Sequence, residues 1–290
     1  MPEFIMKQMI KKTLRPIFKK AFLTRLHLRF LISSETKVRY QCNICGWIGS
    51  VPVSVASSRE LPSCCGCGSN LRFRSIISVL IKELSGGGSI LTSQIANKSV
   101  LGMGMSDSDV YAQPLSKLYA YENTFYDREP KFDVTVAKLA ARKGKYKFVI
   151  SSDVYEHIPY PVDIAFHNLY NLLAPGGICI FSVPFDITGT TKEHFPALHE
   201  WQISVRDGKQ VIINKLEDGS IQIFENLCFH GGSGATLEMR RFAQNHLLEQ
   251  FNFAGFKDIH IHSEELPEHG IIFGTKDSYV ISATKPHNTN

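Results

Sequence analysis

The sequence predicts an α/β protein whose main domain is a doubly wound, mostly parallel β-sheet, with a small N-terminal metal-binding module and an inserted β-rich segment. Residues 147–185 predict the sheet, because they contain a strand, a helix and a second strand in succession. Such a unit crosses over with right-handed geometry onto a parallel sheet in nearly all proteins. The module is predicted by five of the seven cysteines, which fall between Cys42 and Cys67.

The first strand of this unit is the apolar, β-branched run of residues 148–150, which is typical of a buried strand. A polar cluster that ends at Asp153 follows it. Apolar side chains at helical spacing occupy residues 162–173, and Pro175-Gly176-Gly177 predicts the end of that helix. Residues 178–183 form the second apolar run. Because ligands bind at the carboxyl ends of strands in such sheets, Asp153 is expected at a functional edge.

The segments before this unit supply the start of the sheet. A predicted helix leads to Gly86-Gly87-Gly88, which is typical of a hinge. Pro130 and weak periodicity leave almost no room for a helix between the second and third strands. In chain order, the predicted elements are a helix at 71–84, a strand at 98–103, a helix at 111–118, and strands at 118–121 and 132–136.

A long segment, residues 186–241, interrupts the pattern after the last strand of the unit. Asp218-Gly219 lies in it between two alternating stretches, which predicts a β-hairpin. We expect this β-rich insertion to recognise a substrate, because loops on a rigid scaffold carry specificity. The remaining predicted elements are the hairpin strands 210–214 and 220–224, a helix at 239–251, and final strands at 258–262 and 278–284.

These elements divide the chain into a basic helical arm over residues 1–35, a cysteine module with a connecting helix over 36–85, and the main domain over 86–290. The apolar fraction of 43% is ordinary for a globular protein. No run approaches the ~18 apolar residues of a membrane span, and no signal-peptide pattern appears. Clustered cysteines favour a metal over disulfides, so we expect a cytoplasmic protein.

Positive charge is concentrated in residues 1–30, which hold eight Lys or Arg and one acidic residue, a net of +7. The whole chain carries +5, so the remainder sums to about −2. Residues 5–32 predict an amphipathic helix that is interrupted near Pro16. Such a helix suits an anionic membrane surface, here the inner face of the membrane. Packing on the rest of the protein is the alternative, and contact with nucleic acid is a third, less favoured one.

Two C-x2-C-G motifs lie in the cysteine module, one at Cys42 and Cys45 and the other at Cys64 and Cys67. Each motif brings two thiolates together in a tight turn, and four thiolates form the closed tetrahedral set of a structural Zn²⁺ site. The glycine after each motif allows the backbone to turn beneath the metal. Cys65 is an alternative to Cys64, but the two-residue spacing favours Cys64. The sequence therefore predicts a zinc ribbon.

The second half of the chain resembles the class I S-adenosylmethionine (SAM) methyltransferases. The motifs that carry the resemblance are Asp153 after its strand, the Glu156-His157 pair in the following loop, and Leu173-Ala174-Pro175-Gly176-Gly177 before the next strand. The resemblance extends from about Asn97 to the C-terminus. It implies a Rossmann-like doubly wound sheet of class I methyltransferase type, with SAM as the cofactor.

The resemblance also implies a SAM-binding turn after the first strand of the domain. The family usually has an acidic residue there, followed by G-x-G-x-G. In this chain Gly102 stands in place of the acid and Gly104 in place of the first glycine, while Ser106 and Ser108 stand at the later glycines. Such a turn brings backbone N–H groups to the carboxylate of the ligand at a helix N-terminus. A plain strand-to-helix turn is the alternative.

Three acidic residues complete the implied cofactor site. Glu122 follows the second strand, where a carboxylate accepts the two ribose hydroxyls, and Asp127 is its alternative. Asp133 lies near the position where the family contacts adenine. Asp153 lies at the end of its strand, near the expected methyl donor.

Histidines are the candidate general bases, because their pKa lies near neutral pH. His157 follows the Asp153 loop, while His194, His199 and His230 lie in the insertion. As a group they predict a polar substrate pocket, with His194 as the first choice for the base and His157 as the second. The His194-x4-His199 spacing also permits a metal, although no carboxylate-rich motif accompanies it.

Three functions follow from these features. The leading one is a SAM-dependent methyltransferase, an O-methyltransferase that acts on a hydroxyl of a small molecule or glycan. The second is an RNA methyltransferase, in which Arg72 and Arg74 beside the ribbon would contact phosphate instead of pairing with acidic residues of the main domain. Against it, the body of the chain is slightly acidic and no base-stacking motif follows residues 148–150. The third is a non-catalytic binding protein, because the glycine-rich turn is degenerate.

Overall fold

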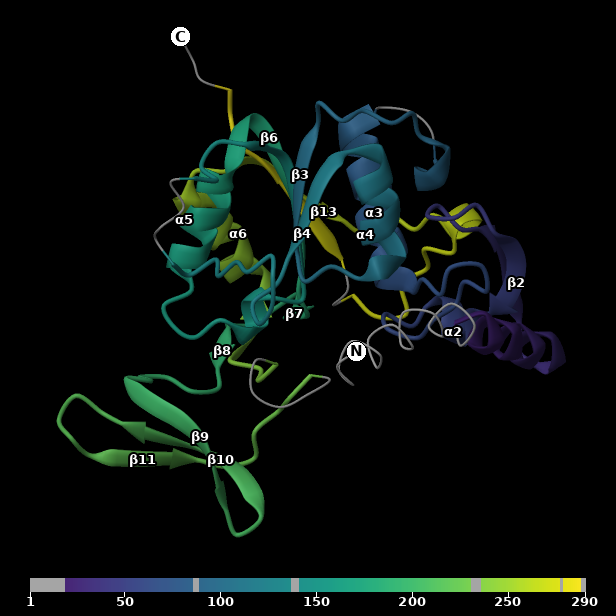
Figure 1. Ribbon diagram of the computed structural model, residues 1–290. Coiled ribbons are helices and arrows are strands. Elements are labelled where there is room, and N and C mark those ends of the chain that lie inside the picture. The colour runs from purple at the N-terminus through teal and green to yellow at the C-terminus, as the bar shows by residue number, and fades with distance from the viewer. Residues whose placement is uncertain (1–18, 86–88, 137–140, 231–235, 277–278, 288–290) are drawn as a thin grey trace, which may run out of the picture. The chain divides into compact units, whose positions relative to one another are not determined.

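The computed structural model describes residues 19–85, 89–136, 141–230, 236–276 and 279–287, which form two compact units (Figure 1). The first unit contains the described residues up to Ile95, together with Asp109–Pro114 and Glu264–Thr275. The second contains Ala96–Ser108, Leu115–Ser263 and the described residues from Lys276 onward. The predicted hinge at Gly86-Gly87-Gly88 and residues 1–18 of the predicted arm lie outside the described residues.

The second unit is built on a six-stranded sheet in the order β13-β14-β6-β5-β3-β4. Neighbouring strands from β6 to β4 pair in parallel, and β14 is antiparallel to both of its neighbours, so the sheet is mostly parallel as predicted. The strands are β3 (Leu101–Met105), β4 (Ala120–Thr124), β5 (Tyr146–Ser152), β6 (Leu173–Ser182), β13 (Lys257–His262) and β14 (Val280–Thr284).

The predicted strand–helix–strand unit is confirmed as β5, α5 (Asp163–Leu172) and β6. The glycines after the helix have a structural reason. Gly176 adopts a φ of +69°, and a Cβ added to Gly177 would lie 2.8 Å from the carbonyl oxygens of Ala174 and Tyr146. A side chain at either position would therefore strain the turn that returns the chain to the sheet.

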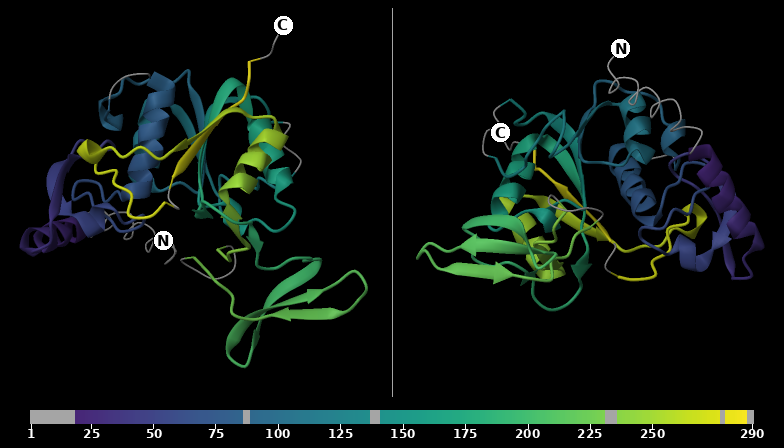
Figure 2. Two further views of the ribbon diagram at one scale, coloured as in Figure 1. Left: turned by 180° about the vertical axis from the view of Figure 1, so that it is seen from behind. Right: turned by 60° about the horizontal axis from the view of Figure 1, so that its bottom comes forward.

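Two helices, α5 and α6 (Gln244–Ala254), lie side by side on one face of this sheet (Figures 1 and 2). The core beneath them is rich in aromatic rings. Phe166 of α5 contacts Phe251 of α6 and Phe181 of β6, with ring centroids 5.1 and 5.8 Å apart. All three side chains are fully buried. Burying such rings contributes the dominant stabilisation of a sheet–helix layer.

Several predicted elements differ from those observed. Residues 132–136 are not a strand, because the Asp133 carboxylate accepts from the Thr135 backbone N–H and hydroxyl and so closes a turn. The predicted strand at 118–121 begins later, at Ala120, because α4 (Asp109–Leu118) extends to Leu118. The strand at 98–103 is likewise shifted, to Leu101–Met105. The predicted helix at 239–251 begins as strand β12 (Arg240–Ala243) before α6.

The insertion is β-rich, as predicted, and forms a three-stranded antiparallel sheet of its own (Figure 1). Its strands are β9 (Glu200–Arg206), β10 (Lys209–Lys215) and β11 (Ile221–Phe224). The Asp218-Gly219 hairpin is confirmed between β10 and β11. A second Asp-Gly turn, Asp207-Gly208, joins β9 to β10, with φ of 51° and 74°. Phe195, Ile212, Leu237 and Met239 form the core of this segment.

A short sheet in the order β7-β12-β8 connects the insertion to the main sheet. β7 (Phe185–Asp186) leaves directly after β6, and β8 (Lys192–Glu193) leads into the insertion. β12 returns the chain from the insertion, pairing in parallel with β7 and antiparallel with β8. Both ends of the insertion are thus fixed at one place in the second unit.

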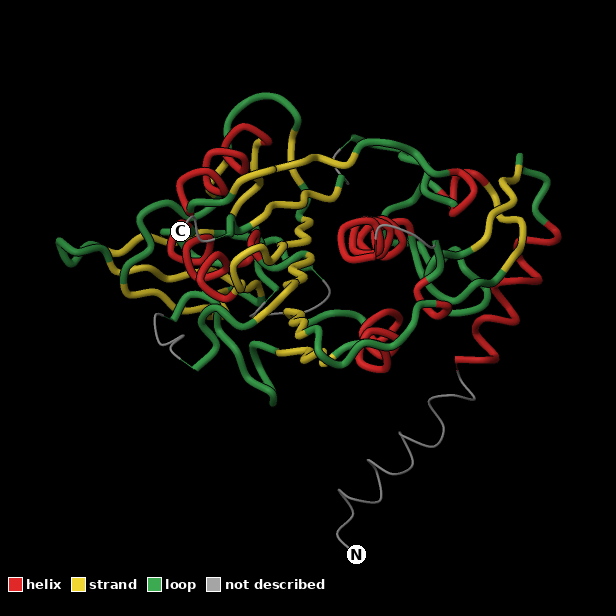
Figure 3. The backbone as a smooth tube through the Cα atoms, turned by 90° about the horizontal axis from the view of Figure 1, so that it is seen from above, coloured by secondary structure: helices red, strands yellow, loops and turns green. Residues whose placement is uncertain are grey.

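The first unit combines a two-stranded hairpin with short helices and long loops (Figure 3). β1 (Lys37–Gln41) and β2 (Ile48–Pro52) are antiparallel and are followed by α2 (Val53–Ala56) and α3 (Leu71–Ser85), which confirms the predicted helix at 71–84. The 3-10 turns are η1 (Leu91–Ser93) and η3 (Pro267–His269). η3 comes from the chain between β13 and β14, and its His269 Nδ1 lies 3.0 Å from the Gln41 carbonyl oxygen.

The described part of the predicted arm, residues 19–32, is helical and packs within the first unit. Leu23 and Phe30 are buried, and His27 lies edge-on to Trp47. The helix also lines a surface cavity of about 480 Å³ together with Trp47 and Cys65. Among the described residues, no helix combines the length and apolar character needed to cross a membrane.

Candidate functional site

Polar residues gather at the carboxyl ends of β5 and β6. The Oγ atoms of Ser152 and Ser182 are 3.0 Å apart, and the backbone N–H of Asp153 donates to the Ser182 carbonyl oxygen at 2.8 Å. Asp153 has a φ of 54°. Ser106, after the neighbouring β3, also has a positive φ, 59°. Non-glycine residues in this conformation store of order 1–3 kcal/mol of strain and cluster at ligand sites.

The glycines of the β3 turn are required by packing inside the second unit. A Cβ at Gly102 would lie 2.1 Å from the ring of Phe148, which belongs to the paired strand β5. A Cβ at Gly104 would lie 1.9 Å from the Tyr121 hydroxyl and 2.2 Å from the Asp107 carboxylate. Gly102 therefore has no room for the acidic side chain that the family usually carries there.

Asp107 is a buried acid in this turn that the sequence analysis did not single out. It accepts a hydrogen bond from the Tyr121 hydroxyl. Its backbone N–H donates to Asn123 Oδ1 at 2.9 Å, and its carbonyl accepts from Asn123 Nδ2 at 2.9 Å. The signal was present as an acid three residues after Gly104, but its partners lie on β4, more than a dozen residues further along. Together they fix the turn to the end of β4.

Glu122 lies in the middle of β4 and forms a paired network. Both of its carboxylate oxygens accept from the Arg142 guanidinium, and the Tyr146 hydroxyl donates to Oε2 at 3.1 Å. The hydrogen bond from Arg142 is the largest cause that lowers the pKa of Glu122. The same pairing raises the pKa of Arg142, while burial raises the pKa of Tyr146. Arg142 lies 20 residues from Glu122 along the chain, so no local sequence pattern indicates this pair.

The other two acids proposed near the cofactor have local partners. Asp133 Oδ1 accepts from the Thr135 backbone N–H at 2.9 Å and from the Thr135 hydroxyl at 2.7 Å. Asp127 is mostly exposed, and its Oδ1 lies 3.7 Å from Arg128. Both acids therefore contact neighbours in the chain. Among the described residues, these hydrogen bonds and this ion pair do not link either acid to the ends of β3 and β5.

Histidines from distant parts of the chain come together around Glu238. His194 Nε2 lies 2.8 Å from Glu238 Oε1, and His230 Nε2 lies 2.9 Å from Glu238 Oε2. His157 is next to them, with its ring centroid 5.3 Å from that of His230. His199 is not part of this group, because its nearest acid is Glu217 at 4.0 Å. Of the four predicted histidines, the structure therefore joins three and separates one.

Backbone hydrogen bonds connect the three segments that carry this group. The N–H of Met239 donates to the Glu156 carbonyl at 2.7 Å, and the N–H of His194 donates to the Met239 carbonyl at 2.9 Å. The N–H of Glu238 donates to the Cys228 carbonyl at 2.8 Å. These bonds join the loop after β5, the segment after β8 and the irregular segment before β12. The sequence analysis did not include Glu238, because its contact with His194 joins residues 44 positions apart and forms only in the folded chain.

Burial shapes the chemistry of His157. Its Nδ1 lies 3.0 Å from the Leu237 carbonyl oxygen, and its side chain is 14% exposed. Burial is the largest cause that lowers the pKa of this imidazole. A neutral ring that donates from Nδ1 keeps its lone pair on Nε2, which lies 3.8 Å from Glu156 Oε1.

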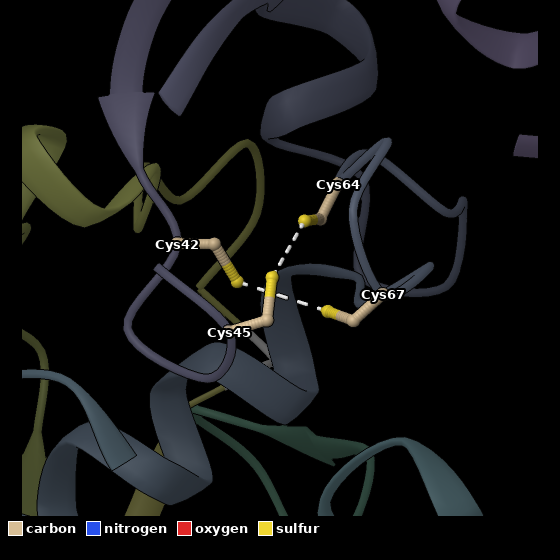
Figure 4. A group of neighbouring side chains, drawn as sticks. All are labelled: Cys42, Cys45, Cys64 and Cys67. Atoms are coloured by element: carbon tan, nitrogen blue, oxygen red, sulfur yellow. Dashed lines mark hydrogen bonds between the residues drawn. The ribbon is translucent and has the colours of Figure 1, made fainter. Parts of the chain in front are cut away.

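The four predicted zinc ligands converge in the first unit (Figure 4). The sulfur atoms of Cys42 and Cys67 are 3.9 Å apart, and those of Cys45 and Cys64 are 3.6 Å apart. Four sulfurs at ~2.3 Å from one zinc ion in a tetrahedron are about 3.8 Å apart. The donor set and its size therefore fit Zn²⁺.

The two C-x2-C-G turns have the same backbone geometry. Gly46 and Gly68 have φ of 76° and 84°, and their N–H groups donate to the Cys42 and Cys64 carbonyls, each at 2.8 Å. Hydrogen bonds among the thiols lower the pKa of Cys42 and raise the pKa of Cys45 and Cys67. Cys65 lies outside this set of four, and burial raises its pKa to about 11.

Arg72 and Arg74 have partners in the first unit. Arg72 forms a two-pronged ion pair with Glu60, at 2.8 and 2.7 Å. Arg74 is fully buried and donates to Ser63 Oγ and to the Gly270 carbonyl, each at 2.8 Å. Arg72 thus pairs with an acid of the first unit, and the fully buried Arg74 is not accessible to a phosphate.

The comparisons with known proteins agree with this architecture. Residues 78–217, which are 140 of the 290 residues, match the family model described as a methyltransferase domain. The match covers just under half of the chain. The matched residues include β3, β5 and β6 with the polar residues at their carboxyl ends. No curated protein sequence matches the chain.

Several solved structures are distantly similar. One is the Burkholderia thailandensis 1,6-didemethyltoxoflavin-N1-methyltransferase with S-adenosylhomocysteine bound, at 12% identity and a TM-score of 0.40, covering 72% of this chain and 76% of that one. Another is CalS10, an amino pentose methyltransferase from Micromonospora echinaspora, at 12% identity and a TM-score of 0.40, covering 75% and 92%. Streptomyces venezuelae DesVI matches at 13% identity and a TM-score of 0.35, covering 63% and 83%.

Proposed function

We propose that this protein is a SAM-dependent methyltransferase that transfers a methyl group to a hydroxyl of a small molecule or glycan. The observation that carries the proposal is the methyltransferase-domain match over residues 78–217, whose parallel strands end in polar and left-handed residues. Methyl transfer is an in-line displacement at a sulfonium carbon. The enzyme mainly aligns donor and acceptor, and removes a proton when the acceptor is a hydroxyl.

SAM would lie at the carboxyl edge of β3, β5 and β4. The proposed contacts are the turn after β3 and the carboxylate of Asp153, since two strained residues mark this edge. Glu122 stays the proposed ribose contact, although Arg142 and Tyr146 already bond its carboxylate. A carboxylate has about four acceptor positions and these partners use three, so one position remains for a ribose hydroxyl. The complete proposed set is Gly102, Gly104, Ser106, Glu122, Asp133 and Asp153.

His194 is the proposed general base, with His157 as the second candidate. His194 is 36% exposed, so an acceptor can reach it, and its Nε2 bonds Glu238. A carboxylate beside a histidine orients the ring and stabilises the imidazolium that forms when the ring takes a proton. The insertion that carries His194 leaves the sheet through β7, directly after β6. It therefore starts at the edge where the methyl donor would bind.

We also propose that Cys42, Cys45, Cys64 and Cys67 bind a structural Zn²⁺. A set of four thiolates is coordinatively closed, so this ion would stabilise the first unit and take no part in the chemistry. The buried Arg74 and the Arg72–Glu60 pair disfavour the RNA methyltransferase alternative, because the ribbon's arginines are used within its own unit. A zinc ribbon that contacts phosphate would be expected to leave its arginines accessible to the ligand.

A non-catalytic binding protein is the second candidate function. It is favoured by one observation: the Tyr121 hydroxyl and the Asp107 carboxylate fill the space above Gly104, where a glycine-rich turn usually receives a ligand. Binding of SAM distinguishes it from the leading proposal.

The experiment is a calorimetric titration of the full chain with SAM, repeated with Glu122→Ala. We expect binding by the wild type, and a loss of about 1.5–3 kcal/mol in the variant, the value of a charge-assisted hydrogen bond. Unchanged affinity in the variant would move the ribose contact to another residue. No binding by the folded wild type would support the non-catalytic candidate. SAM consumption against sugar, lipid-linked and RNA acceptors then separates the acceptor classes.

A further inference from the structure

A further group of metal-type ligands lies within the second unit. One ligand atom each from Glu156, His157 and His230 lies within 4.8 Å of the others. A second group, Cys228, His230 and Glu238, meets the same criterion and shares His230. We propose that Glu156, His157 and His230 bind a divalent transition-metal ion. The proposal concerns binding alone and does not depend on methyl transfer.

The donor set is suited to such an ion. Two imidazoles and one carboxylate form the protein ligands of many Zn²⁺, Mn²⁺ and Fe²⁺ sites, which leave further positions for water or a substrate. Ligands to one ion at ~2.0–2.2 Å lie about 3–3.5 Å apart. His157 Nε2 is 3.8 Å from Glu156 Oε1, so a small side-chain movement would bring both to one ion.

Each imidazole already has one nitrogen occupied by an acceptor. His157 Nδ1 bonds the Leu237 carbonyl at 3.0 Å, and His230 Nε2 bonds Glu238 Oε2 at 2.9 Å. Metal-ligating histidines almost always donate their second nitrogen to a carbonyl or a carboxylate, which fixes the ring and raises its basicity. In the neutral ring the other nitrogen then carries the lone pair. His157 would therefore bind the ion through Nε2 and His230 through Nδ1.

The backbone positions the loop that carries two of these ligands. The fully buried Arg240 donates from Nη1 to the Tyr155 carbonyl at 3.0 Å and to the Ile158 carbonyl at 2.5 Å. These two carbonyls flank Glu156 and His157. Arg240 is itself held by Glu193, whose Oε1 accepts from its Nε at 2.7 Å. The loop is thus fixed from both ends, which lowers the cost of ordering the ligands around an ion.

The rigidity of this loop favours the group of Glu156, His157 and His230 over the overlapping group that contains Cys228. Glu156 is 1% exposed and His157 lies in the fixed loop, whereas Cys228 is exposed. In the proposed arrangement Glu238 orients His230 instead of binding the ion. His194, which bonds the other oxygen of Glu238, stays outside the set of ligands and remains available as a base.

The test counts metal ions in the tag-free full-length chain. After incubation with excess Zn²⁺ and removal of unbound metal, mass spectrometry should find two zinc ions per wild-type chain and one in His157→Gln, Glu156→Gln and His230→Gln. The affinity of the second ion should fall by more than the ~10–100-fold that follows loss of an outer-shell partner. A titration with Mn²⁺ as the probe should show one site in the wild type and none in these variants.

Two matched variants serve as controls. His199→Gln removes an exposed histidine of the same insertion, and Cys228→Ser removes a ligand of the overlapping group. Both should keep two zinc ions. His230 is 38% exposed, so its variant should fold even where the buried Glu156→Gln does not, which a thermal melt establishes. Equal zinc content in the wild type and His230→Gln would overturn the proposal. Loss of the ion in Cys228→Ser would also overturn it, in favour of the other group.

Discussion

At the residue scale, the pairing of Glu122 with Arg142 makes part of the stability depend on pH. The pKa of this carboxyl is lowered from its ordinary 4.5, chiefly by the hydrogen bond from Arg142. A depressed carboxyl pKa contributes stability that is fully present above the unfolded value of 4.5 and is lost as the pH falls through the lower, folded value. The contribution should therefore be complete at neutral pH and absent in acid.

We expect Arg142→Met to lower the free energy of unfolding at neutral pH by at most ~1 kcal/mol, because solvent screens this partly exposed pair. The difference from the wild type should shrink as the pH falls below about 4. Thermal melts across this range measure it. Lys143→Met, at the exposed neighbouring residue, is the matched control and should show no such trend. A deficit of the same size at every pH would mean that Arg142 stabilises by packing alone.

The proposed base leads to a second prediction at this scale. His194→Ala should lower turnover by roughly 10²–10⁴-fold while leaving SAM affinity nearly unchanged, because only the proton acceptor is removed. His199→Ala, in the same insertion but outside the Glu238 group, should retain activity. Turnover with the acceptor identified by the screen, together with SAM calorimetry, gives both quantities. Full activity in both His194→Ala and His157→Ala would mean that neither histidine is a general base and that the enzyme acts by positioning the donor and the acceptor alone.

At the scale of elements, the cysteine turns tie β1 and β2 to the segment before α3. Cys45→Ser should abolish the zinc ion of the first unit and destabilise that unit by more than ~4 kcal/mol, since loss of a structural metal is among the largest single-residue effects. Cys65→Ser is the matched control, because Cys65 lies outside the set of four. Metal analysis and thermal melts check both. Wild-type protein purified without chelator that contains no zinc would contradict the zinc ribbon.

Elements whose signals are local were predictable from the sequence. Short-range patterns indicated three features: the β5–α5–β6 unit, the Asp218-Gly219 hairpin and the two C-x2-C-G motifs. The structure forms the unit and the hairpin, and it places the four cysteines of the motifs next to one another. Strand β9 was missed even though Asp207-Gly208 is a second hairpin signal of the same kind. The prediction of a strand at 132–136 was wrong. Its apolar, β-branched residues suit a strand, but the Asp133 side chain closes a turn with Thr135.

The candidate site was predictable only in part, for a physical reason. His157 and His194 were predicted as chemical groups, but the pairing of His194 with Glu238 and of Arg240 with the Tyr155 carbonyl was not, because these partners lie 44 and 85 residues apart along the chain. A hydrogen bond between such distant residues leaves no periodic pattern in the sequence. The same holds for Glu122, whose guanidinium partner is 20 residues away.

At the scale of the whole molecule, the helix of residues 19–32 has two faces. Leu23 and Phe30 are buried within the first unit, while Leu28, Leu31 and Ile32 are 56%, 58% and 84% exposed. Exposed basic residues accompany the apolar ones: Lys19, Lys20, Arg25 and Arg29. We propose that this exposed face attaches to an anionic lipid surface while Leu23 and Phe30 stay packed.

Replacing these four basic residues by Gln in the full chain should weaken co-sedimentation with vesicles that contain anionic lipid, by about 1 kcal/mol for each charge near the surface. Neutral vesicles are the control, and SAM affinity should not change. Equal co-sedimentation of the variant and the wild type would leave the helix as a packing element of the first unit alone.

The segment Glu264–Thr275, which joins the first unit from between β13 and β14, has a consequence for the order of biosynthesis. Gly270 is made 196 residues after its partner Arg74, and His269 is made 228 residues after its partner Gln41. Domains generally fold during synthesis from the N-terminus onward. Here an earlier segment must wait for a later one, and a fragment ending at Ile95 would leave the buried guanidinium of Arg74 without one of its acceptors.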